Sequence, residues 1–274
     1  MTRILRNALF SLLLAGLVLG GLEGIARLVR DPGLYAGDPG SVWTLRADLP
    51  PRSVPFPERA TSFTVRTNAH GYRGGPAPEG AILCLGDSTT FGWGVEEAEA
   101  WPARLSALLG RAVVNGGVPG YSTAQGVATL DHALSLHPRA VLLAYLVRDA
   151  ERAAGPDSAR AASTLPDLAL LRLFRTARDP RPLAAGVTFR VPPEAYEANL
   201  RALRARIEAT GAAALLFAFP MATPPDAHLA VLDRLGAPAP DLSDDVFFPE
   251  DPIHLTPQGH DTLTRWVAST LPIP

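Results

Sequence analysis

Three short stretches of the sequence carry residue types that together can perform nucleophilic catalysis. The first is Gly86-Asp87-Ser88, which follows an apolar run over residues 81–85. The others are a glycine-rich segment over residues 116–120 and Asp251-Pro252-Ile253-His254 near the C-terminus. A serine hydroxyl is a weak nucleophile at neutral pH and needs an adjacent base, which itself needs an orienting partner. We therefore expect Ser88 to be the nucleophile, His254 the base and Asp251 the residue that orients His254.

Each stretch also has a purely structural explanation. Serine is a common helix N-cap and Asp-Ser is a common turn. Asp251 can cap a turn in a loop bracketed by prolines while His254 packs on the last helix, and the glycines can simply form a tight turn. The catalytic interpretation depends on whether the fold brings the three stretches together.

An ester carbonyl under attack becomes a tetrahedral oxyanion, which needs fixed hydrogen-bond donors. The backbone N–H of Ser88 is one candidate. A glycine N–H from residues 116–120 is a second, because this turn follows a neighbouring strand. Neighbouring parallel strands end at the same edge of a sheet, so both donors are expected there.

Apolar runs alternate with helical patterns from residue 81 to residue 270. Strands are expected at residues 81–85, 112–115, 140–146, 212–219 and 246–248, and helices at 101–109, 122–136, 193–209, 226–235 and 257–270. Continuous apolar strands that alternate with helices predict a parallel sheet covered on both faces. Residues 149–191 interrupt the pattern, and we interpret them as an insertion with one amphipathic helix at 165–174.

The N-terminal segment has the pattern of a targeting sequence. Arg3 and Arg6 precede an apolar run over residues 8–22, which is short for a membrane span of about 20 residues. No A-x-A cleavage site follows the run. We favour an uncleaved signal-anchor with its N-terminus in the cytoplasm and the bulk of the chain outside. Cleavage near residues 20–21 and a helix of a soluble core are the alternatives.

We divide the chain into a signal-anchor over residues 1–30, an extension over residues 31–80 and a main domain over residues 81–274. The extension is interpreted as a tether with a small strand-bearing part. Its only strand-like run covers residues 62–67, where apolar and polar residues alternate. Trp43 and Phe63 are expected to pack on the main domain.

Charge and cysteine content exclude several functions. The net charge of −2 gives no electrostatic case for nucleic-acid binding. The single cysteine, Cys84, excludes an internal disulfide and a multi-cysteine metal site. His70, His132, His137 and His228 have no partners at a recognisable metal-ligand spacing, so we expect no metal site. His260 falls in the last helix and is expected to be structural.

Taken in order, the three stretches resemble the SGNH (GDSL-type) hydrolase family of serine esterases and lipases. Gly86-Asp87-Ser88 matches its first block, residues 115–120 (Asn-Gly-Gly-Val-Pro-Gly) match its second, and Asp251-Pro252-Ile253-His254 matches its last. The resemblance covers roughly residues 81–270. It implies a flavodoxin-like three-layer α/β/α domain, a Ser/His/Asp triad, Gly120 as an oxyanion donor, acyl-ester substrates and no cofactor. Residues 67–74 look like the segment that precedes the nucleophile in membrane-anchored bacterial members.

The sequence departs from the family pattern at Arg148. The third block usually reads G-x-N-D, and its Asn side chain completes the oxyanion hole, whereas this chain has Arg148-Asp149. Arg148 can replace the amide donor or bind an anionic group of the substrate. It can also pair with Asp87 or Asp149 and leave a weak or inactive enzyme, or be an ordinary surface charge.

Together, the resemblance and the expected anchor imply a membrane-anchored, extracytoplasmic serine esterase. The first expected substrate is an O-acetyl ester on cell-envelope carbohydrate, and a lipid or another short acyl ester is the next. Two alternatives remain open from the sequence. One is an acyltransferase that uses the same triad with a sugar acceptor, and the other is a non-catalytic glycan-binding or assembly protein that kept the fold.

Overall fold

A four-stranded parallel sheet forms the centre of the computed structural model, which describes residues 3–29, 33–38, 40–153, 156–157, 188–221 and 226–273. The strands are β5 (Ile82–Gly86), β6 (Val113–Gly117), β7 (Ala140–Ala144) and β10 (Ala213–Leu216), in the spatial order β10-β7-β5-β6. This order is that of a flavodoxin-like sheet, whose connections change direction between the first and third strands. Here that point lies between β5 and β7, where Ser88 follows β5.

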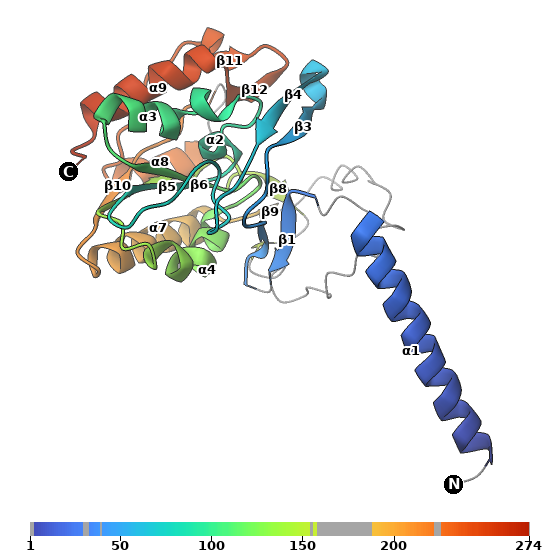
Figure 1. Cartoon of the computed structure of the whole chain (residues 1–274). Helices are drawn as coiled ribbons and strands as arrows, with labels where there is room; N and C mark the ends of the chain where they lie inside the picture. Colours follow the sequence, from blue (N-terminus) through green and yellow to red (C-terminus); the bar gives the residue numbers. More distant parts are fainter. Residues whose placement is uncertain are drawn as a thin grey trace.

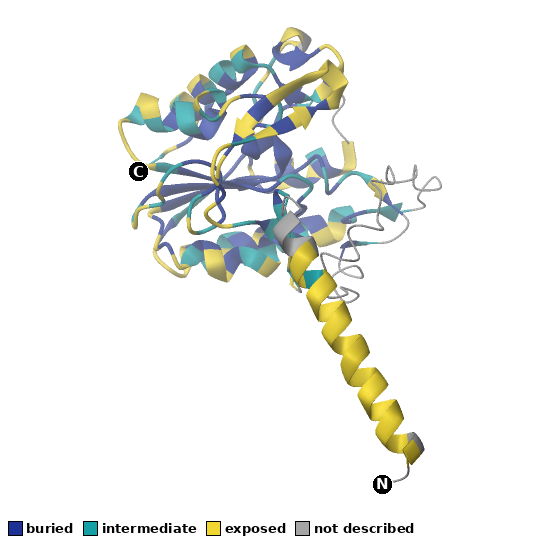
Figure 2. Cartoon of the chain, turned by 45° about the vertical axis from the view of Figure 1, so that its right-hand side comes forward, coloured by how far each residue is buried: buried dark blue, intermediate teal, exposed yellow. Residues whose placement is uncertain are grey.

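Helices cover both faces of the sheet (Figure 1). α3 (Trp101–Leu109) and α9 (Pro257–Thr270) pack together on one face. α4 (Thr123–Leu134) and α7 (Pro193–Glu208) pack on the other, where α8 (Asp226–Arg234) contacts α7. Every residue of β5 and β7 is buried, and the strands form the dark blue centre of Figure 2. The predicted flavodoxin-like three-layer α/β/α architecture is therefore confirmed.

Side chains of β5 divide between the two hydrophobic layers as the pleat requires. Ile82 and Cys84 belong to the cluster that includes α3 and α9, whereas Leu83 and Leu85 belong to the cluster that includes α4 and α7. Cys84 is fully buried as a small residue of the core. Burial of a side chain such as Leu83 contributes about 1.5–3 kcal/mol.

The predicted helix bounds hold better than the predicted strand bounds. α3 and α9 begin and end where the sequence pattern places them. β7, however, ends at Ala144 rather than at residue 146. Its neighbour β5 ends at Gly86, which lies opposite Ala144, so β7 has no partner there beyond that point. The helix expected at residues 165–174 lies outside the described residues.

Contrary to prediction, the last expected strand is not part of the central sheet. β11 (Phe247–Phe248) pairs antiparallel with β12 (Asp251–Leu255) in a separate two-stranded sheet. Asp251 and His254 therefore lie on a short strand rather than on the expected loop. Pro252 is compatible with this strand because its side chain is exposed and the pairing with β11 is irregular.

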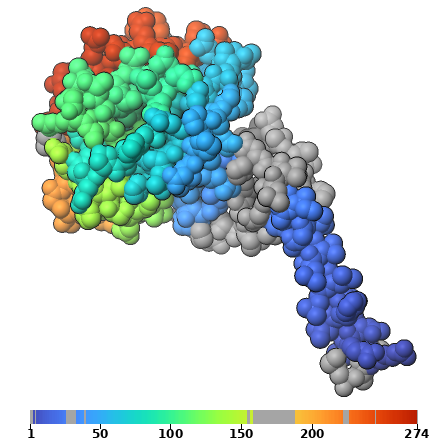
Figure 3. All heavy atoms as spheres, in the orientation of Figure 1, coloured from blue at the N-terminus to red at the C-terminus, as the bar shows by residue number. Residues whose placement is uncertain are grey.

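The extension contains more strands than the single predicted run. β1 (Tyr35–Asp38) pairs with β2 (Val42–Leu45), and β3 (Arg52–Phe56) pairs with β4 (Thr61–Val65). Gly and Pro residues in β1 and β3 weaken the alternation from which strands are predicted. The β3–β4 hairpin lies beside the C-terminal segment (Figure 3), with the rings of Phe56 and Phe248 5.3 Å apart.

α1 (Arg3–Val29) projects away from the rest of the described structure (Figure 2). Its stretch Leu5–Ile25 has 21 residues, a mean hydropathy of 2.0 and no buried part. At 1.5 Å per residue this stretch is about 32 Å long, which matches the hydrocarbon core of a bilayer. The apolar stretch is therefore longer than the run expected from residues 8–22, and it is long enough for a membrane anchor. A signal sequence has the same position and composition.

Candidate active site

Ser88, His254 and Asp251 meet in one hydrogen-bonded chain. Nε2 of His254 lies 2.8 Å from Oγ of Ser88, and Nδ1 of His254 lies 2.5 Å from Oδ2 of Asp251. Ser88 is 2% exposed and His254 is 7% exposed, so bulk water has little access to these contacts. When Asp251 accepts a hydrogen bond from Nδ1–H of His254, Nε2 carries no proton and is free to take the proton of the serine hydroxyl. This arrangement can therefore activate Ser88 as a nucleophile.

Ser88 is the first residue of α2 (Ser88–Phe91), a single turn that follows β5 directly. Asp87 is the N-cap, because its Oδ1 accepts the N–H of Thr89 at 2.8 Å and the hydroxyl of Thr89 at 2.7 Å. The Ser88 hydroxyl is therefore not used for capping, which removes the main structural explanation for this residue. The turn is tight enough to require Gly86, since a Cβ there would collide with the Thr90 side chain.

Asp251 is ionised at neutral pH. Burial raises the pKa of the Asp251 carboxyl, but hydrogen bonds from His254 and from backbone N–H groups outweigh burial and hold the pKa below its usual value. Oδ1 accepts the N–H of Ile253 at 3.1 Å. With one oxygen on the backbone and the other on His254, the carboxylate fixes the orientation of the imidazole.

The turn between β6 and α4 holds Gly120 in a conformation that favours glycine. Its φ is +86°, and a Cβ would come within 2.9 Å of the Trp43 ring. Nε1 of Trp43 donates to the carbonyl of Pro119 at 3.1 Å, and Arg190 donates to the carbonyl of Gly120 at 2.8 Å. Within the described part of the chain, the N–H groups of Gly120 and Ser88 have no acceptor. Both are therefore available as donors to a ligand.

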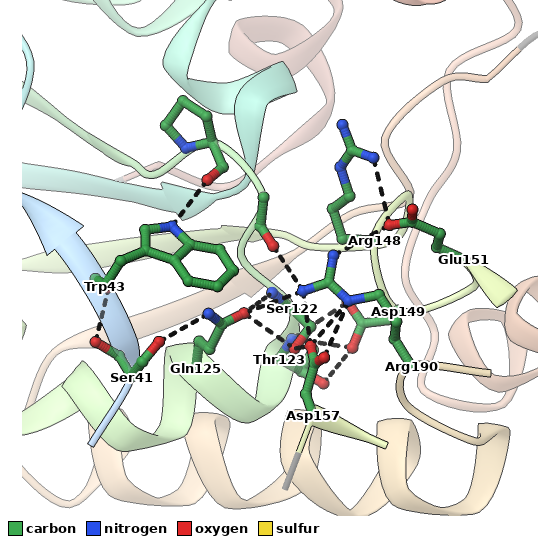
Figure 4. A network of polar contacts seen from close by, with 12 residues as sticks. Ser41, Trp43, Ser122, Thr123, Gln125, Arg148, Asp149, Glu151, Asp157 and Arg190 are labelled. Carbon is green, nitrogen blue, oxygen red and sulfur yellow. Dashed lines mark hydrogen bonds and ion pairs between the residues drawn. The ribbon is translucent and has the colours of Figure 1, made fainter. Parts of the chain in front are cut away.

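Arg190 is the centre of a buried polar network that supports this turn (Figure 4). Its guanidinium pairs with Asp157 at 2.8 Å and with Glu151 at 3.1 Å. Asp157 also accepts the hydroxyl of Ser122, the N-cap of α4, at 2.7 Å. The sequence analysis missed both Arg190 and Asp157. Both residues lie within the stretch 149–191 that we interpret as an insertion, and their local sequence gives no further signal of this role.

Arg148 lies in the turn after β7 and pairs with neither Asp87 nor Asp149. Its Nη1 is 3.3 Å from a carboxylate oxygen of Glu151. Asp149 instead accepts the N–H and the hydroxyl of Thr123 at the start of α4, at 2.9 and 2.5 Å. Burial raises the pKa of Asp149 to about 7 although the Thr123 hydrogen bonds oppose it. Asp149 is therefore not a full negative charge beside Arg148 at neutral pH.

A model of the GDSL-like lipase/acylhydrolase family matches residues 84–262, a range that contains Ser88, Gly120, Arg148, Asp251 and His254. The chain belongs to this family. It is thus a GDSL-like hydrolase, and the observed sheet order and layers are those of the SGNH fold.

Solved structures of similar fold are distant in sequence from this GDSL-like hydrolase. A protein assigned to the G-D-S-L family of lipolytic proteins from Desulfitobacterium hafniense DCB-2 is 15% identical, with a TM-score of 0.48, and covers 70% of this chain and 100% of its own. The psychrotrophic esterase EstA from Pseudoalteromonas sp. is 15% identical, with a TM-score of 0.44 and coverages of 70% and 96%. LAE5, an alpha/beta hydrolase from the metagenome of Lake Arreo, is 18% identical, with a TM-score of 0.44 and the same coverages. No curated protein matches the chain.

A buried arginine fixes the position of α2 in the GDSL-like hydrolase. Arg73 is 3% exposed, and its guanidinium donates to the carbonyl oxygens of Phe91, Gly92, Val95 and Thr64 at 2.7–3.1 Å. Burial lowers the pKa of Arg73 to about 10, so it remains charged at neutral pH. The sequence analysis noted residues 67–74 only as part of the resemblance and did not assign Arg73 a role. A charged residue two positions after the Asn68-x-x-Gly71 turn was the available signal.

Substitution of Arg73 by methionine is expected to lower the free energy of unfolding by about 3 kcal/mol or more, because four carbonyl groups lose a charged donor. Arg66→Met is the matched control. Arg66 pairs with Glu97 at the surface, and such pairs contribute about 0–1 kcal/mol. Urea unfolding of the full chain in detergent, followed by circular dichroism, measures both. Equal midpoints for the two variants would show that Arg73 does not stabilise the fold.

His260 is buried and neutral, as its expected structural role requires. Its Nδ1 accepts the N–H of Trp101 at 3.2 Å. Burial, with smaller contributions from nearby cations such as Arg73, lowers the pKa of His260 to about 3. An unfolded chain binds this proton near pH 6.5. The stability due to His260 is therefore complete above about pH 6.5 and is lost as the pH falls towards 3.

We expect His260→Gln to reduce the acid dependence of stability between pH 6 and 4.5, because the glutamine oxygen can accept the same N–H and does not titrate. The substitution should reduce the loss of unfolding free energy by at most about 1.4 kcal/mol per pH unit. His137→Gln is the control, since the His137 side chain is 74% exposed. Urea unfolding at several pH values measures the slope. A slope unchanged by His260→Gln would contradict this assignment.

Two further side chains that follow Ser88 closely in sequence have structural contacts. Trp93 packs edge-on against Phe63 with ring centroids 5.2 Å apart, and the Thr89 hydroxyl is held by Asp87. Over the described ranges, no three His, Cys, Asp or Glu side chains are grouped in a way that could hold a metal ion.

Proposed function

We propose that this chain is a serine esterase that uses Ser88 as nucleophile, His254 as general base and Asp251 as orienting carboxylate. The observation that carries the proposal is the unbroken chain of hydrogen bonds from Ser88 Oγ through His254 to Asp251, at 2.8 and 2.5 Å. These contacts join a helix turn after β5 to a strand more than 160 residues further on. The same geometry argues against a protein that kept the fold without the chemistry.

In the proposed reaction, Ser88 Oγ attacks the ester carbonyl carbon while Nε2 of His254 takes the hydroxyl proton. The resulting oxyanion accepts hydrogen bonds from the N–H groups of Ser88 and Gly120. Collapse of the intermediate breaks the bond to the alcohol, which leaves with the proton held by His254. Water then adds to the acyl-enzyme, His254 again takes a proton, and the acid and free Ser88 are released.

The proposed natural substrate is an acyl ester, with an O-acetyl group on cell-envelope carbohydrate as the first choice and a lipid ester as the second. The support is the family and the apolar helix α1, which fits an anchor. Arg3 and Arg6 on its N-terminal side favour an extracytoplasmic main domain. Within this proposal residues 1–30 are the anchor, 31–80 the extension, and 81–274 the catalytic domain with its insertion at 149–191.

The test is acetate release from an O-acetylated polysaccharide by the purified full chain in detergent. One arm contains only the O-acetylated polysaccharide. The other arm contains the same polysaccharide together with an unacetylated acceptor glycan. Hydrolysis predicts free acetate in both arms, whereas transfer to the acceptor predicts acetylated acceptor and less free acetate. Release no faster than in buffer, for this glycan and for simple aryl acetates, would refute an esterase.

A further inference from the structure

Arg148 lies at the sheet edge that carries the candidate nucleophile. β5 and β7 are neighbouring parallel strands, and Gly86 lies opposite Ala144 at their ends. Ser88 comes two residues after Gly86, and Arg148 comes four residues after Ala144. A cation is therefore positioned where this fold binds ligands.

The hydrogen-bonding capacity of Arg148 is largely unused. A guanidinium has five N–H donors. In the part of the chain that the structure describes, the Arg148 Nε is buried without a hydrogen-bond partner. Among the described residues, its one ion pair is the contact of Nη1 with Glu151 at 3.3 Å. A buried donor without an acceptor destabilises the free protein, and a ligand that supplies the acceptor removes this cost.

The described neighbouring acids, Glu151 and Asp149, do not fully neutralise Arg148. Glu151 is shared with Arg190, which it contacts at the shorter distance of 3.1 Å. The oxygens of Asp149 accept hydrogen bonds from Thr123 instead. Figure 4 shows the Arg148 guanidinium turned away from Asp149 and Arg190. One shared carboxylate leaves part of the positive charge available to a ligand.

A chain of hydrogen bonds connects Arg148 to the turn of Gly120, the proposed oxyanion donor. Arg190 contacts Glu151 through Nη1 and the carbonyl of Gly120 through Nη2. Glu151 in turn holds Arg148. Because Arg190 is buried, this connection fixes Arg148 relative to Gly120 rather than leaving it as a mobile surface side chain.

We propose that Arg148 makes the enzyme selective for esters that carry an anionic group, a carboxylate or a phosphate, beside the ester bond. The planar fork of a guanidinium fits the two oxygens of either group. Such a ligand supplies an acceptor for the guanidinium and competes with Glu151 for the charge. This inference rests on the proposed esterase function and specifies its substrate class.

The test compares esters that differ in charge. The wild-type full chain, Arg148→Gln and Arg152→Gln are assayed for kcat/KM on 4-acetoxybenzoate, its neutral methyl ester and 4-acetoxyphenyl phosphate. Arg148→Gln is expected to lower the anionic-to-neutral ratio of kcat/KM by about tenfold or more, because a charge-assisted contact is lost. Arg152 stacks on Phe189 at 4.2 Å and carries the same charge, so Arg152→Gln should leave the ratio within about twofold.

The carboxylate and phosphate arms identify the preferred anion, which is the one whose ratio falls further. Glu151→Gln removes the competing carboxylate and is expected to raise the ratio. An equal loss of activity on neutral and anionic esters would assign Arg148 to the oxyanion and overturn the selectivity. A ratio that does not change in Arg148→Gln would overturn it as well.

A binding measurement tests the anion site at Arg148 independently of the esterase function. Calorimetry of the Ser88→Ala protein with 4-acetoxybenzoate measures anion binding without turnover. Binding at least about tenfold weaker in Ser88→Ala/Arg148→Gln supports the anion site even if no ester is hydrolysed. Binding that is absent from both proteins, or equal in both, counts against the anion site whatever the hydrolysis assays show.

Discussion

Replacement of Ser88 by alanine is expected to lower kcat for aryl acetates by about 10⁵- to 10⁶-fold, while KM changes little. The loss is large because Ser88 Oγ is the atom that His254 contacts at 2.8 Å, and alanine leaves the base with no hydroxyl to activate. Residual activity comes from the backbone donors alone. Initial rates with 4-nitrophenyl acetate measure the effect. Ser106→Ala on α3 is the matched control, since its hydroxyl bonds only the carbonyl of Arg111 at the surface.

The Ser88→Ala/His254→Ala double variant tests whether Ser88 and His254 act as a unit. His254→Ala should cost about as much as Ser88→Ala, and the combination should cost no more than either alone. Losses that multiply would mean that Ser88 and His254 act independently. If Ser88→Ala keeps more than about a hundredth of the wild-type activity, Ser88 is not the nucleophile.

Much of the fold could be predicted because its signals are local. The apolar runs of β5 and β7 are continuous since both faces of the central sheet are covered. The start of α9 could be predicted from Thr256 and Pro257, and the Thr256 hydroxyl does accept the N–H of Gly259 at 3.1 Å. The pairing of Ser88 with His254 was inferred from residue types, because a serine nucleophile needs a base and an orienting acid.

What was missed depends on contacts that the local sequence pattern does not reveal. The strand β12 exists because Leu255 and Asp251 pair with Phe247 and Phe248, whereas the local prolines favour a loop. The supports of the Gly120 turn are Trp43 and Arg190, which lie 76 and 70 residues away in sequence from their partners. Trp43 was expected to pack on the main domain, but no local pattern shows that Trp43 or Arg190 supports this turn, so the turn was predicted without the groups that hold it.

The second large effect is expected at Asp251, where substitution by asparagine should lower kcat by about 10⁴-fold. Asparagine keeps the shape of the side chain but has only one acceptor oxygen. Oδ1 of Asp251 accepts the backbone N–H of Ile253 at 3.1 Å, so the amide oxygen has to remain at this position. The amide NH₂ then faces Nδ1 of His254, which must become an acceptor. The imidazole proton is thereby forced onto Nε2, where it faces Ser88 and blocks proton transfer.

A matched control separates this effect from a simple loss of charge. Asp261→Asn on α9 removes the same charge from a carboxylate that pairs with Arg104 and Arg265 at the surface. It is expected to change kcat by less than about twofold. The tautomer itself is visible by proton NMR. The strongly hydrogen-bonded Nδ1 proton of His254 should give a low-field resonance in the wild type and in Asp261→Asn, and not in Asp251→Asn.

A merely structural role for Asp251 predicts a different result. If the carboxylate only stabilised the strand β12, Asp251→Asn would lower the thermal midpoint and leave the kcat of the folded fraction near the wild-type value. Orientation of the base predicts the reverse, with kcat lost in a protein whose near-ultraviolet circular dichroism is unchanged. Because the Ile253 N–H favours one orientation of the amide, Ile253→Pro in the Asp251→Asn background weakens that preference and lets the amide turn its oxygen towards His254 more often. Partial recovery of kcat in that double variant would show that the tautomer, rather than the charge, limits the reaction.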